Sequence, residues 1–288
     1  MSGGEPSRAR ITGLFVYPVK GCRGIPLDNA VMGERGIEGD RRWMIVTPEG
    51  RFLSQRELPA MATIATGLRG GTLVLRHGAE SVELQQREHG EAMRVQVWRD
   101  AVDALRPSPA ADRLVSGWLG REVRLVRFPE AARRPCDPDY APAGSHTAFA
   151  DGFPLLVTTQ ASLDALNATL TERAAASVPM ARFRPSIVVS GVAAGEEDRH
   201  RWLHLAGGAA VELVKPCDRC VVVTTDQESG LRDGAEPLAT LKTVRRNPRS
   251  GGAWFGQNGV PHLPGGVQAA LSVGATVAFA STPPAPLR

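Results

Sequence analysis

Short runs of apolar and β-branched residues recur along the whole chain, and clusters of Gly and Pro separate them. Runs of about four to eight such residues bounded by turn-forming residues are typical of β-strands. The pattern occurs at residues 14–19, 43–46, 72–76, 94–98, 123–128, 154–159, 186–191, 211–214, 220–226 and 275–280. It therefore predicts a chain dominated by short strands.

Three segments instead carry apolar residues at the three- and four-residue spacing of a helix. The first opens with Ser108 as N-cap and Pro109 at the first helical position, and it ends at Gly120. The second covers residues 160–174 with Thr159 as its cap, and the third follows Glu236-Pro237. The apolar positions that we expect to be buried are Leu114, Val115, Trp118, Leu119, Leu163, Leu166, Leu170, Leu238, Leu241 and Val244.

Two connecting segments define the expected organisation. Residues 47–50 read Thr-Pro-Glu-Gly, with Pro and Gly at the second and fourth positions of a type I turn, which predicts a β-hairpin. Residues 129–150 are dense in Pro, Ala and charge and have no apolar period. We place a domain boundary there, between a mostly β first half and a mixed second half.

The composition is that of an ordinary globular protein. Of 288 residues, 42% are hydrophobic and 22% are charged, which excludes disorder as the main state. This length allows one large domain or two packed ones. No apolar run reaches the roughly 18 residues of a membrane span, and the N-terminus has no apolar signal region. We therefore expect a cytoplasmic protein with no membrane partner.

The net charge is +4, but the basic residues are scattered along the chain. Nucleic-acid-binding proteins concentrate basic residues on one face or along a stripe. We therefore expect no nucleic-acid partner. Among 34 Lys and Arg residues, lysine occurs only as Lys20, Lys215 and Lys242, so a lysine at a motif position is notable.

Cys217 and Cys220, separated by two residues, are the strongest candidates for chemistry. The chain has four cysteines, too few for a disulfide scaffold of this length. The cations Lys215 and Arg219 near Cys217 favour its thiolate. A thiolate is both a nucleophile and a soft-metal ligand, so a redox dithiol, a zinc site and a site for another sulfur-binding metal are open. Two buried structural thiols are the remaining interpretation.

The neighbouring sequence disfavours two of these interpretations. A thioredoxin-type pair opens a helix, whereas residues 221–226 have strand character. A zinc site would recruit His200 and His204, but the apolar residues between and beside them indicate a strand. Strand residues four apart lie too far from each other for easy chelation.

Basic residues recur beside glycine or proline at residues 17–24, 39–42 and 183–185. Each segment alone is typical of a solvated turn, but together they could form an anion cradle, because Arg, Lys and exposed glycine amides suit phosphate. The sequence contains no GxxxxGK[ST], HExxH or GxSxG motif, and no GxGxxG leading from strand to helix. Nucleotide-binding folds and serine hydrolases are therefore disfavoured.

Seven segments, in the same order, resemble the molybdenum-cofactor proteins that carry an N-terminal MOSC β-barrel followed by a MOSC domain. The resemblance is to the branch of the mitochondrial amidoxime-reducing component and its bacterial N-hydroxylaminopurine-detoxifying relatives, and it covers about residues 9–280. The segments are LFVYPVKGCRG; GDRRWMIV with SQRELP; FADGFPLLVTTQASLDALN; FRPSIVVSG; KPCDRCVVVTTDQESG; EPLATLK; and WFGQN.

This resemblance implies a mainly β fold with a few helices (α+β). An N-terminal β-barrel-like domain over residues 8–128 would pack on a MOSC β-barrel domain over residues 129–282, and residues 283–288 would form a disordered tail. Substrate would enter an open pocket between the two domains.

The resemblance also implies site residues. Cys217 would be the protein thiolate on molybdenum, completed by dithiolene sulfurs and oxo groups of the cofactor, whereas Cys220 would be structural. Three basic residues lie where the family binds the pterin and its phosphate: Lys20, Arg41 and Arg184. The other cofactor-binding candidates are Gly21 and Ser186, which are Ser and Asn in animal members, and Arg56, Asp151 and Asp226, whose roles are less defined.

The implied activity is the reduction of N–O bonds in small N-hydroxylated compounds, such as hydroxylamines, N-hydroxylated bases and amidoximes. The cofactor would be Mo-molybdopterin, and no pyridoxal phosphate is expected. The sequence has no four-cysteine iron–sulfur pattern, so electrons would come from a separate ferredoxin, flavoprotein or cytochrome b5-like protein. The alternative is a carrier of persulfide sulfur on Cys217 or of assembled cofactor. The basic cradle favours the enzyme.

Overall fold

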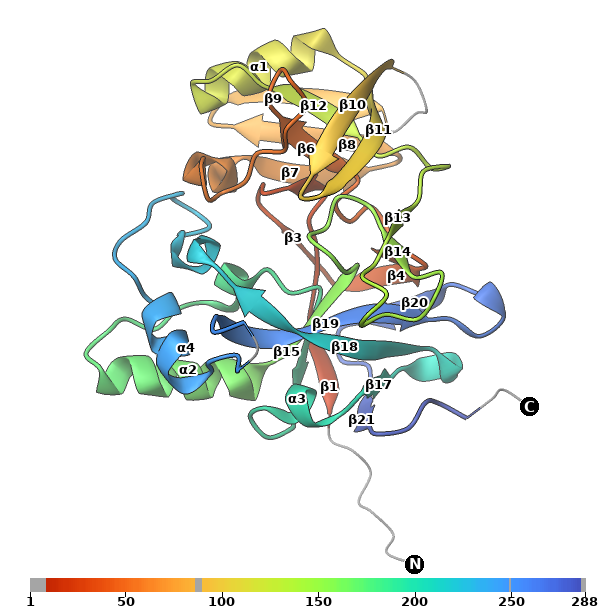
Figure 1. The fold of residues 1–288 in the computed structure, drawn as a ribbon, viewed down its shortest axis with the longest axis vertical. Coiled ribbons are helices and arrows are strands. Elements are labelled where there is room, and N and C mark those ends of the chain that lie inside the picture. Colours follow the sequence, from red (N-terminus) through yellow and green to blue (C-terminus); the bar gives the residue numbers. More distant parts are fainter. Residues whose placement is uncertain (1–8, 86–89, 249, 286–288) are drawn as a thin grey trace, which may run out of the picture.

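Strands gather into two β-rich lobes, one above the other in Figure 1. The computed structural model describes residues 9–85, 90–248 and 250–285. Strands account for 39% of the structure, and there are four α-helices in its described part. These observations confirm the predicted fold class, mainly β with a few helices. Within the described ranges the sheets are open, so the lobes resemble barrels without a closed ring of strands.

The lower lobe is built on an eight-stranded sheet. In spatial order its strands are β21 (Ala278–Ala280), β17 (Trp202–His204), β18 (Ala210–Arg219), β19 (Ala253–His262), β15 (Leu155–Thr159), β16 (Ile187–Ser190), β1 (Arg10–Val16) and β3 (Ile25–Leu27). The helices of this lobe are α2 (Gln160–Glu172), α3 (Glu196–Arg199) and α4 (Leu238–Val244). Because β15 and β16 are parallel, the chain needs a crossover between them, and α2 provides it.

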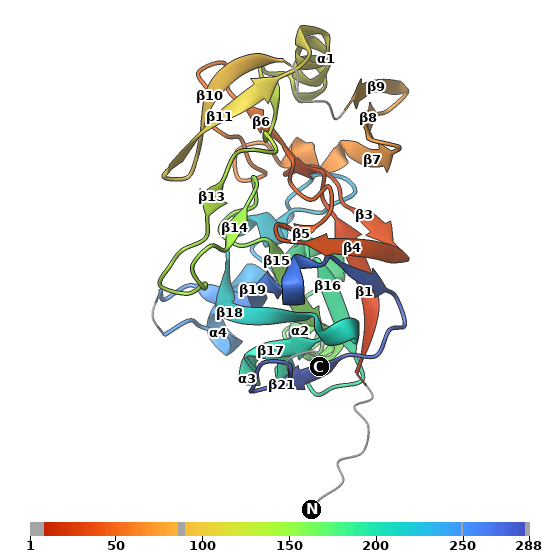
Figure 2. The same cartoon turned by 90° about the vertical axis from the view of Figure 1, so that its right-hand side faces the viewer.

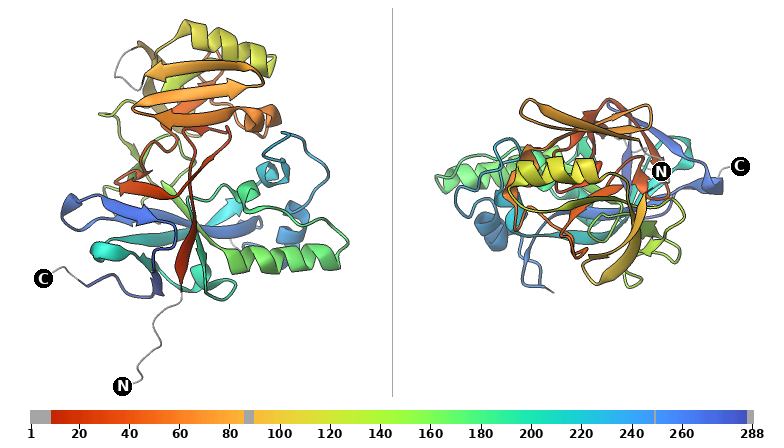
Figure 3. Two further views of the ribbon diagram at one scale, coloured as in Figure 1. Left: turned by 180° about the vertical axis from the view of Figure 1, so that it is seen from behind. Right: turned by 90° about the horizontal axis from the view of Figure 1, so that it is seen from above.

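The upper lobe contains a mixed five-stranded sheet, in which β2 and β6 are parallel, an antiparallel three-stranded unit and one helix. A five-stranded sheet runs in the order β10 (Glu91–Val97), β11 (Asp100–Arg106), β12 (Arg124–Arg127), β6 (Trp43–Val46) and β2 (Val19–Lys20). A three-stranded meander consists of β7 (Ala65–Arg69), β8 (Thr72–His77) and β9 (Glu80–Gln85). Helix α1 (Pro109–Leu119) covers the top of this lobe (Figure 3). Its Val115 and Leu119 pack with Trp43 and Leu73 in one buried core.

Small strand pairs lie where the two lobes meet (Figure 2). Strand β4 (Asn29–Gly33) pairs with β5 (Gly36–Ile37) and with β20 (Ala269–Ser272), and β13 (Arg134–Pro135) pairs with β14 (His146–Thr147). Five 3-10 turns complete the described elements: η1 (Pro59–Thr63), η2 (Met180–Phe183), η3 (Ala206–Gly208), η4 (Val221–Thr224) and η5 (Pro264–Gly266).

The chain passes between the lobes more than once. Strand β1 belongs to the lower sheet, β2 to the upper sheet, β3 again to the lower sheet and β6 to the upper one. Figure 3 shows β1 running down from the lobe junction. Residues 17–24, which include β2, and residues 38–42, which precede β6, therefore lie at the junction between the two lobes. The expected domain boundary at 128/129 stays a prediction.

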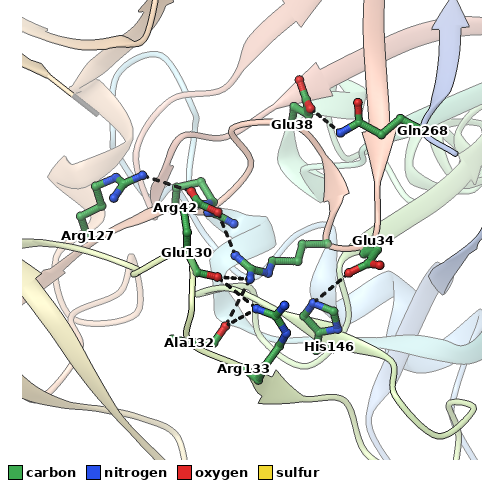
Figure 4. Close-up of polar contacts among 10 residues, drawn as sticks. Glu34, Glu38, Arg42, Arg127, Glu130, Ala132, Arg133, His146 and Gln268 are labelled. Carbon is green, nitrogen blue, oxygen red and sulfur yellow. Dashed lines mark hydrogen bonds and ion pairs between the residues drawn. The ribbon is translucent and has the colours of Figure 1, made fainter. Parts of the chain in front are cut away.

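A carboxylate in the connection between the halves joins several arginines at this junction (Figure 4). Glu130 forms ion pairs with Arg35 from the β4–β5 turn, with Arg42 just before β6, and with Arg127 at the end of β12. Arg35 and Arg133 also donate to the Glu130 carbonyl, at 2.5 and 3.0 Å. Glu130 therefore links three separate strands of the fold.

The predicted helices are confirmed. Ser108 Oγ accepts a hydrogen bond from the Ala111 amide at the start of α1, and Gly120 ends that helix at a φ of 61°. Thr159 caps α2 through the Ser162 amide, and α4 follows Pro237. The turn at residues 47–50 is also present, with Val46 bridging antiparallel to Phe52.

Some local predictions are wrong. Residues 220–226 do not form a strand, because the 3-10 turn η4 occupies residues 221–224. The strand expected over 275–280 is limited to β21, and residues 129–150 contain the short β13 and β14 pair. Val244 is 50% exposed, so the apolar stripe of α4 is not wholly core. Residues 286–288 of the expected tail lie outside the described residues.

Candidate functional site

One pocket at the lobe junction brings together most of the candidate residues. Seven of them line it: Lys20, Gly21, Arg41, Arg56, Asp151, Arg184 and Cys217. Further lining comes from Trp98 on the β10–β11 turn, from Arg182 on η2, and from Asp218 and Arg219 at the end of β18. Residues that are far apart in the sequence therefore meet because the crossing segments, the upper hairpin and the end of β18 converge here.

Cys217 reaches the pocket from an irregular part of β18. The register between β18 and β19 shifts between Pro216 and Asp218, so Cys217 lies at a bulge, a feature that re-aims side chains. Burial raises the pKa of the Cys217 thiol, and the charge of Arg219 opposes this only in part. Lys215 instead places its ammonium 4.2 Å from the centre of the Tyr140 ring. The expected effect of Arg219 on the thiolate is confirmed in direction, but burial outweighs it, and the ammonium of Lys215 lies over the Tyr140 ring.

Lys20 and Asp151 form an ion pair across the junction. The Lys20 side chain is nearly buried, and its ammonium also donates to the Phe149 carbonyl at 2.9 Å. Burial lowers the pKa of Lys20, whereas Asp151 acts to raise it. Desolvation in the pocket acts to raise the pKa of Asp151, but the Lys20 ammonium overrides it and holds that pKa well below its usual range. Asp151 is therefore charged at neutral pH.

Two arginines lie against a single tyrosine ring behind the pocket. The guanidinium carbons of Arg41 and Arg184 are each 4.3 Å from the centre of the Tyr17 ring. Both arginines have positive φ, 44° and 55°, a region that residues other than Gly rarely adopt. Arg41 is paired with the buried Asp40, whereas Arg184 donates to the amide oxygen of Gln227 at 3.0 Å. We call Tyr17, Arg41 and Arg184 the arginine clamp.

Tyr17 is fixed on all sides. Its amide donates to Asp40 Oδ1 at 2.8 Å, its hydroxyl donates to the Pro185 carbonyl at 3.1 Å, and its carbonyl accepts from the Arg41 amide at 2.8 Å. Burial raises the pKa of Tyr17 to about 12, and the two arginine charges oppose the shift only in part. The phenol is thus neutral and contributes no negative charge to balance the arginines.

Two more arginines face the pocket from its lower side. Arg219 donates to the Phe255 and Phe183 carbonyls at 2.8 to 3.0 Å, which attaches η2 to β19. Arg182 donates to the Thr224 carbonyl at 2.7 Å, and its buried Nε has no hydrogen-bond partner within the described residues. An unpartnered charged donor in a pocket wall is the kind of group that an anionic ligand satisfies.

The pocket lining as a whole is strongly positive. Its carboxylates are those of Asp151 and Asp218. Its cationic side chains are Lys20, Arg41, Arg56, Arg182, Arg184 and Arg219. The excess of cations indicates an anionic ligand.

The remaining candidates occupy different positions. Ser186 is fully buried between β15 and β1, where its Oγ accepts from the Leu156 amide at 3.2 Å, so it supports the pocket from behind. Asp226 pairs with Arg182 at 3.3 Å and thereby orients a lining residue. Gly21 has a φ of 86°, which suits Gly and would strain a residue with a side chain at this position.

The alternative metal interpretation finds no support in the described residues. They contain no group of three or more His, Cys, Asp and Glu side chains placed to hold a metal ion. His200 contacts Glu196, and His204 contacts the Thr282 carbonyl. Cys220 lines the same pocket as Cys217 and precedes η4.

None of the described helices is long and apolar enough to cross a membrane.

Sequence reasoning missed several residues of this site. Tyr17 stood inside a recognised segment but was not singled out, and Arg182 lies only two residues before Arg184. The position of Arg182 beside the basic candidate Arg184 was the signal that could have identified it. Trp98 carried no such signal, because its role depends on the β10–β11 turn placing it against Asp151.

Comparison with known proteins identifies the class. Residues 8–122 match the MOSC N-terminal beta barrel domain, and residues 144–277 match the MOSC domain. The protein is therefore a MOSC-domain protein, of a family associated with the molybdenum cofactor.

Curated relatives define the family more closely. The chain is 32% identical over 265 residues to mitochondrial amidoxime-reducing component 1 of Mus musculus, covering 85% of this chain and 74% of the relative. The corresponding protein of Xenopus laevis is 30% identical over 260 residues, with 83% and 72% covered. That of Homo sapiens is 29% identical over 245 residues, with 81% and 71% covered. The chain belongs to the family of the mitochondrial amidoxime-reducing components.

The residues of the pocket fit the group that this family implies. An anionic pterin phosphate suits a lining rich in guanidinium groups, with the unpartnered Nε of Arg182 as a donor still to be satisfied. The same pocket contains the thiol of Cys217, a soft ligand suited to a sulfur-rich metal site. The basic wall and the thiol would thus suit two different parts of one such ligand.

Proposed function

We propose that this protein holds the molybdenum cofactor in the junction pocket and reduces the N–O bonds of small N-hydroxylated compounds. The observation that carries the proposal is the opening of the Cys217 thiol onto the same pocket as a wall of cations. When bound, the cofactor supplies a two-electron reduction: the N–OH group takes up two electrons and two protons, the N–O bond breaks, and N–H and water are formed.

The residues of this chain have separate roles in the proposal. Cys217 supplies the thiolate ligand and sets the position of the metal. A metal at this site would be held by the Cys217 thiolate, and it would have to compete with a thiol proton that burial favours. Arg41 and Arg184 hold the anionic end of the cofactor, with Tyr17 fixing their geometry. Lys20 lies beside Asp151 at the junction and adds positive charge next to the amides around Gly21.

Asp226 and Ser186 support this arrangement indirectly, through Arg182 and the β15 backbone. In this proposal the electrons come from a separate redox protein, since the amidoxime-reducing relatives work with separate electron-transfer partners. Substrate enters at the pocket mouth, between Trp98 of the upper lobe and Asp218 of the lower lobe.

The test compares two cysteine variants purified from a host that makes the cofactor. Cys217→Ala should lose molybdenum, measured by plasma mass spectrometry, and should lose reduction of benzamidoxime, while its unfolding transition is kept. Cys220→Ala should keep molybdenum and mainly lower the free energy of unfolding. Equal loss of molybdenum from both folded variants would overturn the assignment of Cys217.

Lys20→Ala provides an independent test of the cationic wall. This variant should retain less pterin after gel filtration, because a charge next to the cofactor is lost. Unchanged pterin content would refute the role of Lys20. A wild-type protein that carries persulfide on Cys217 and no molybdenum would instead support the sulfur-carrier alternative.

A further inference from the structure

An aromatic side chain is held in an unfavourable backbone conformation at the mouth of the pocket. Trp98 occupies the two-residue turn between β10 and β11, since Val97 pairs with Asp100. Its φ is 55°, a left-handed conformation that is unfavourable for a bulky residue. The Trp98 side chain is nevertheless 36% exposed, so burial of the ring in a core does not explain the strain.

The contacts of Trp98 fix its ring in one orientation. Its indole Nε1 donates to Asp151 Oδ1 at 3.1 Å, the same oxygen that pairs with Lys20. Its carbonyl accepts from Gln96 Nε2 at 2.9 Å, and its ring centre lies 4.7 Å from that of Phe52. The upper lobe thus presents a rigid indole toward the carboxylate of the lower lobe.

Arg56 lies on this indole. Its guanidinium carbon is 4.7 Å from the Trp98 ring centre. The Arg56 backbone is anchored, because its amide donates to Ser54 Oγ at 3.2 Å and its carbonyl accepts from Arg232 at 3.1 Å. In the part of the chain that the structure describes, no carboxylate or other acceptor contacts this guanidinium.

A guanidinium stacked on a ring keeps its N–H groups free at its edge, and those groups match the two oxygens of a carboxylate. Arg56 lines the pocket but is not part of the arginine clamp, which Tyr17 holds behind the pocket. The pocket therefore offers two anion-binding positions. The arginine clamp can bind the anionic end of a cofactor, which leaves Arg56 for a second anion.

We propose that Arg56, placed over the Trp98 ring, is a substrate subsite for a negatively charged oxygen group, so that the protein prefers N-hydroxylated compounds that carry a carboxylate. Arg56 is the specificity-determining residue, and Trp98 is its positioning residue. This inference rests on the proposed function for its account of turnover, but the binding step does not depend on electron transfer.

The test uses two probes that differ in one group, benzamidoxime and 4-carboxybenzamidoxime. For the wild-type holoenzyme, kcat/KM should be about tenfold higher for the carboxylated probe, the ratio expected for one charge-assisted hydrogen-bonded pair. Arg56→Gln should abolish this preference through a higher KM for the carboxylated probe. Arg99→Gln is the matched control, because it removes the same charge from the residue next to Trp98 outside the pocket lining.

Trp98 is tested by two substitutions. Trp98→Phe keeps a ring under Arg56 and should retain most of the preference, whereas Trp98→Ala leaves the guanidinium unsupported and should lose it. A structural role alone would lower kcat/KM for both probes equally in Trp98→Ala.

A binding measurement separates this inference from the proposed function. Isothermal titration of the wild-type protein, with no electron donor present, should give tighter binding of the carboxylated probe, and Arg56→Gln should remove the difference. Equal affinity of the wild type for both probes overturns the inference, whatever the turnover. So does loss of molybdenum from Arg56→Gln, which would assign Arg56 to the cofactor. Tight binding of the carboxylated probe without any turnover would instead overturn the proposed function alone.

Discussion

The ring of Tyr17 lies so close to Gly24 that a Cβ on Gly24 would stand 2.3 Å from Tyr17 Cε1. No pair of carbon atoms tolerates that approach, so only Gly lets the ring occupy its place beside Arg41 and Arg184. The geometry of the arginine clamp therefore depends on Gly24, which has no side chain and acts only through the space that it leaves for the Tyr17 ring.

Gly24→Ala should displace the Tyr17 ring and lower the free energy of unfolding by about 1–3 kcal/mol, the usual cost of overpacking. The measurement is urea unfolding followed by circular dichroism. Gly33→Ala is the control, because a Cβ there would meet only the flexible Gln268 side chain, at 3.5 Å. The control should change stability by about 0.5 kcal/mol or less. Equal effects of the two substitutions would contradict the close packing of Tyr17.

Tyr17 should also make the protein sensitive to alkali. Burial raises its pKa to about 12, against about 10 in an unfolded chain. Between these values the folded state keeps the phenol proton and the unfolded state loses it, so stability falls as pH rises. The expected slope from this residue is about 1.4 kcal/mol per pH unit.

Tyr17→Phe removes this titration, so its free energy of unfolding should fall less steeply than that of the wild type between pH 10 and 12. Cys22, whose pKa burial raises to about 12, contributes equally to both proteins. Parallel curves for the two proteins would show that Tyr17 is not the titrating group.

The four cysteines should differ in reactivity toward iodoacetamide. Cys22 and Cys136 are buried, and burial raises their pKa to about 12 and about 11. Cys217 and Cys220 are partly accessible and line the pocket. Mass spectrometry of protein prepared without cofactor, labelled at pH 8, should therefore find label on Cys217 and Cys220 first, and on the buried pair only after unfolding. Early labelling of Cys22 in the native protein would contradict the packing around residues 17–24.

Elements governed by local chemistry could be predicted from the sequence. Ser108 and Thr159 cap their helices through amides three residues ahead, so nearby residues alone determine those helix starts. The apolar runs likewise predict strands such as β6. Residues 221–224 show the limit, since a short β-branched run bounded by polar residues also suits a 3-10 turn when the preceding strand ends at Arg219.

The candidate site was predictable in its charge but not in its geometry. Basic residues beside Gly and Pro indicated an anion cradle, and the pocket unites Lys20, Arg41 and Arg184. The contact of Tyr17 with both arginines could not be predicted, because Arg184 is distant in sequence. Its positive φ could not be predicted either, since residues other than Gly rarely adopt it. Trp98 depends in the same way on a turn of the upper lobe meeting Asp151 of the lower lobe.

Glu130 should stabilise the lobe junction through its charge. Its partners Arg35, Arg42 and Arg127 are largely buried, whereas the Glu130 carboxylate is more exposed. Burial acts to raise the pKa of Glu130, but the hydrogen bond and charge of Arg42, with the charges of Arg35 and Arg127, lower it overall. Glu130→Gln should therefore cost about 1 kcal/mol at pH 7, after allowance for solvent screening of the carboxylate.

The pH dependence of that cost identifies its source. Because the pKa of Glu130 is lower in the folded state, its stabilisation is complete above the unfolded value of about 4.3 and is lost as pH falls through the folded value. The difference in free energy of unfolding between wild type and Glu130→Gln should thus shrink in acid. Glu83→Gln, at an exposed position on β9, should show no such cost at pH 7. A difference that persists unchanged at pH 3 would mean that the Glu130 side chain acts through packing or uncharged hydrogen bonds, not through its charge.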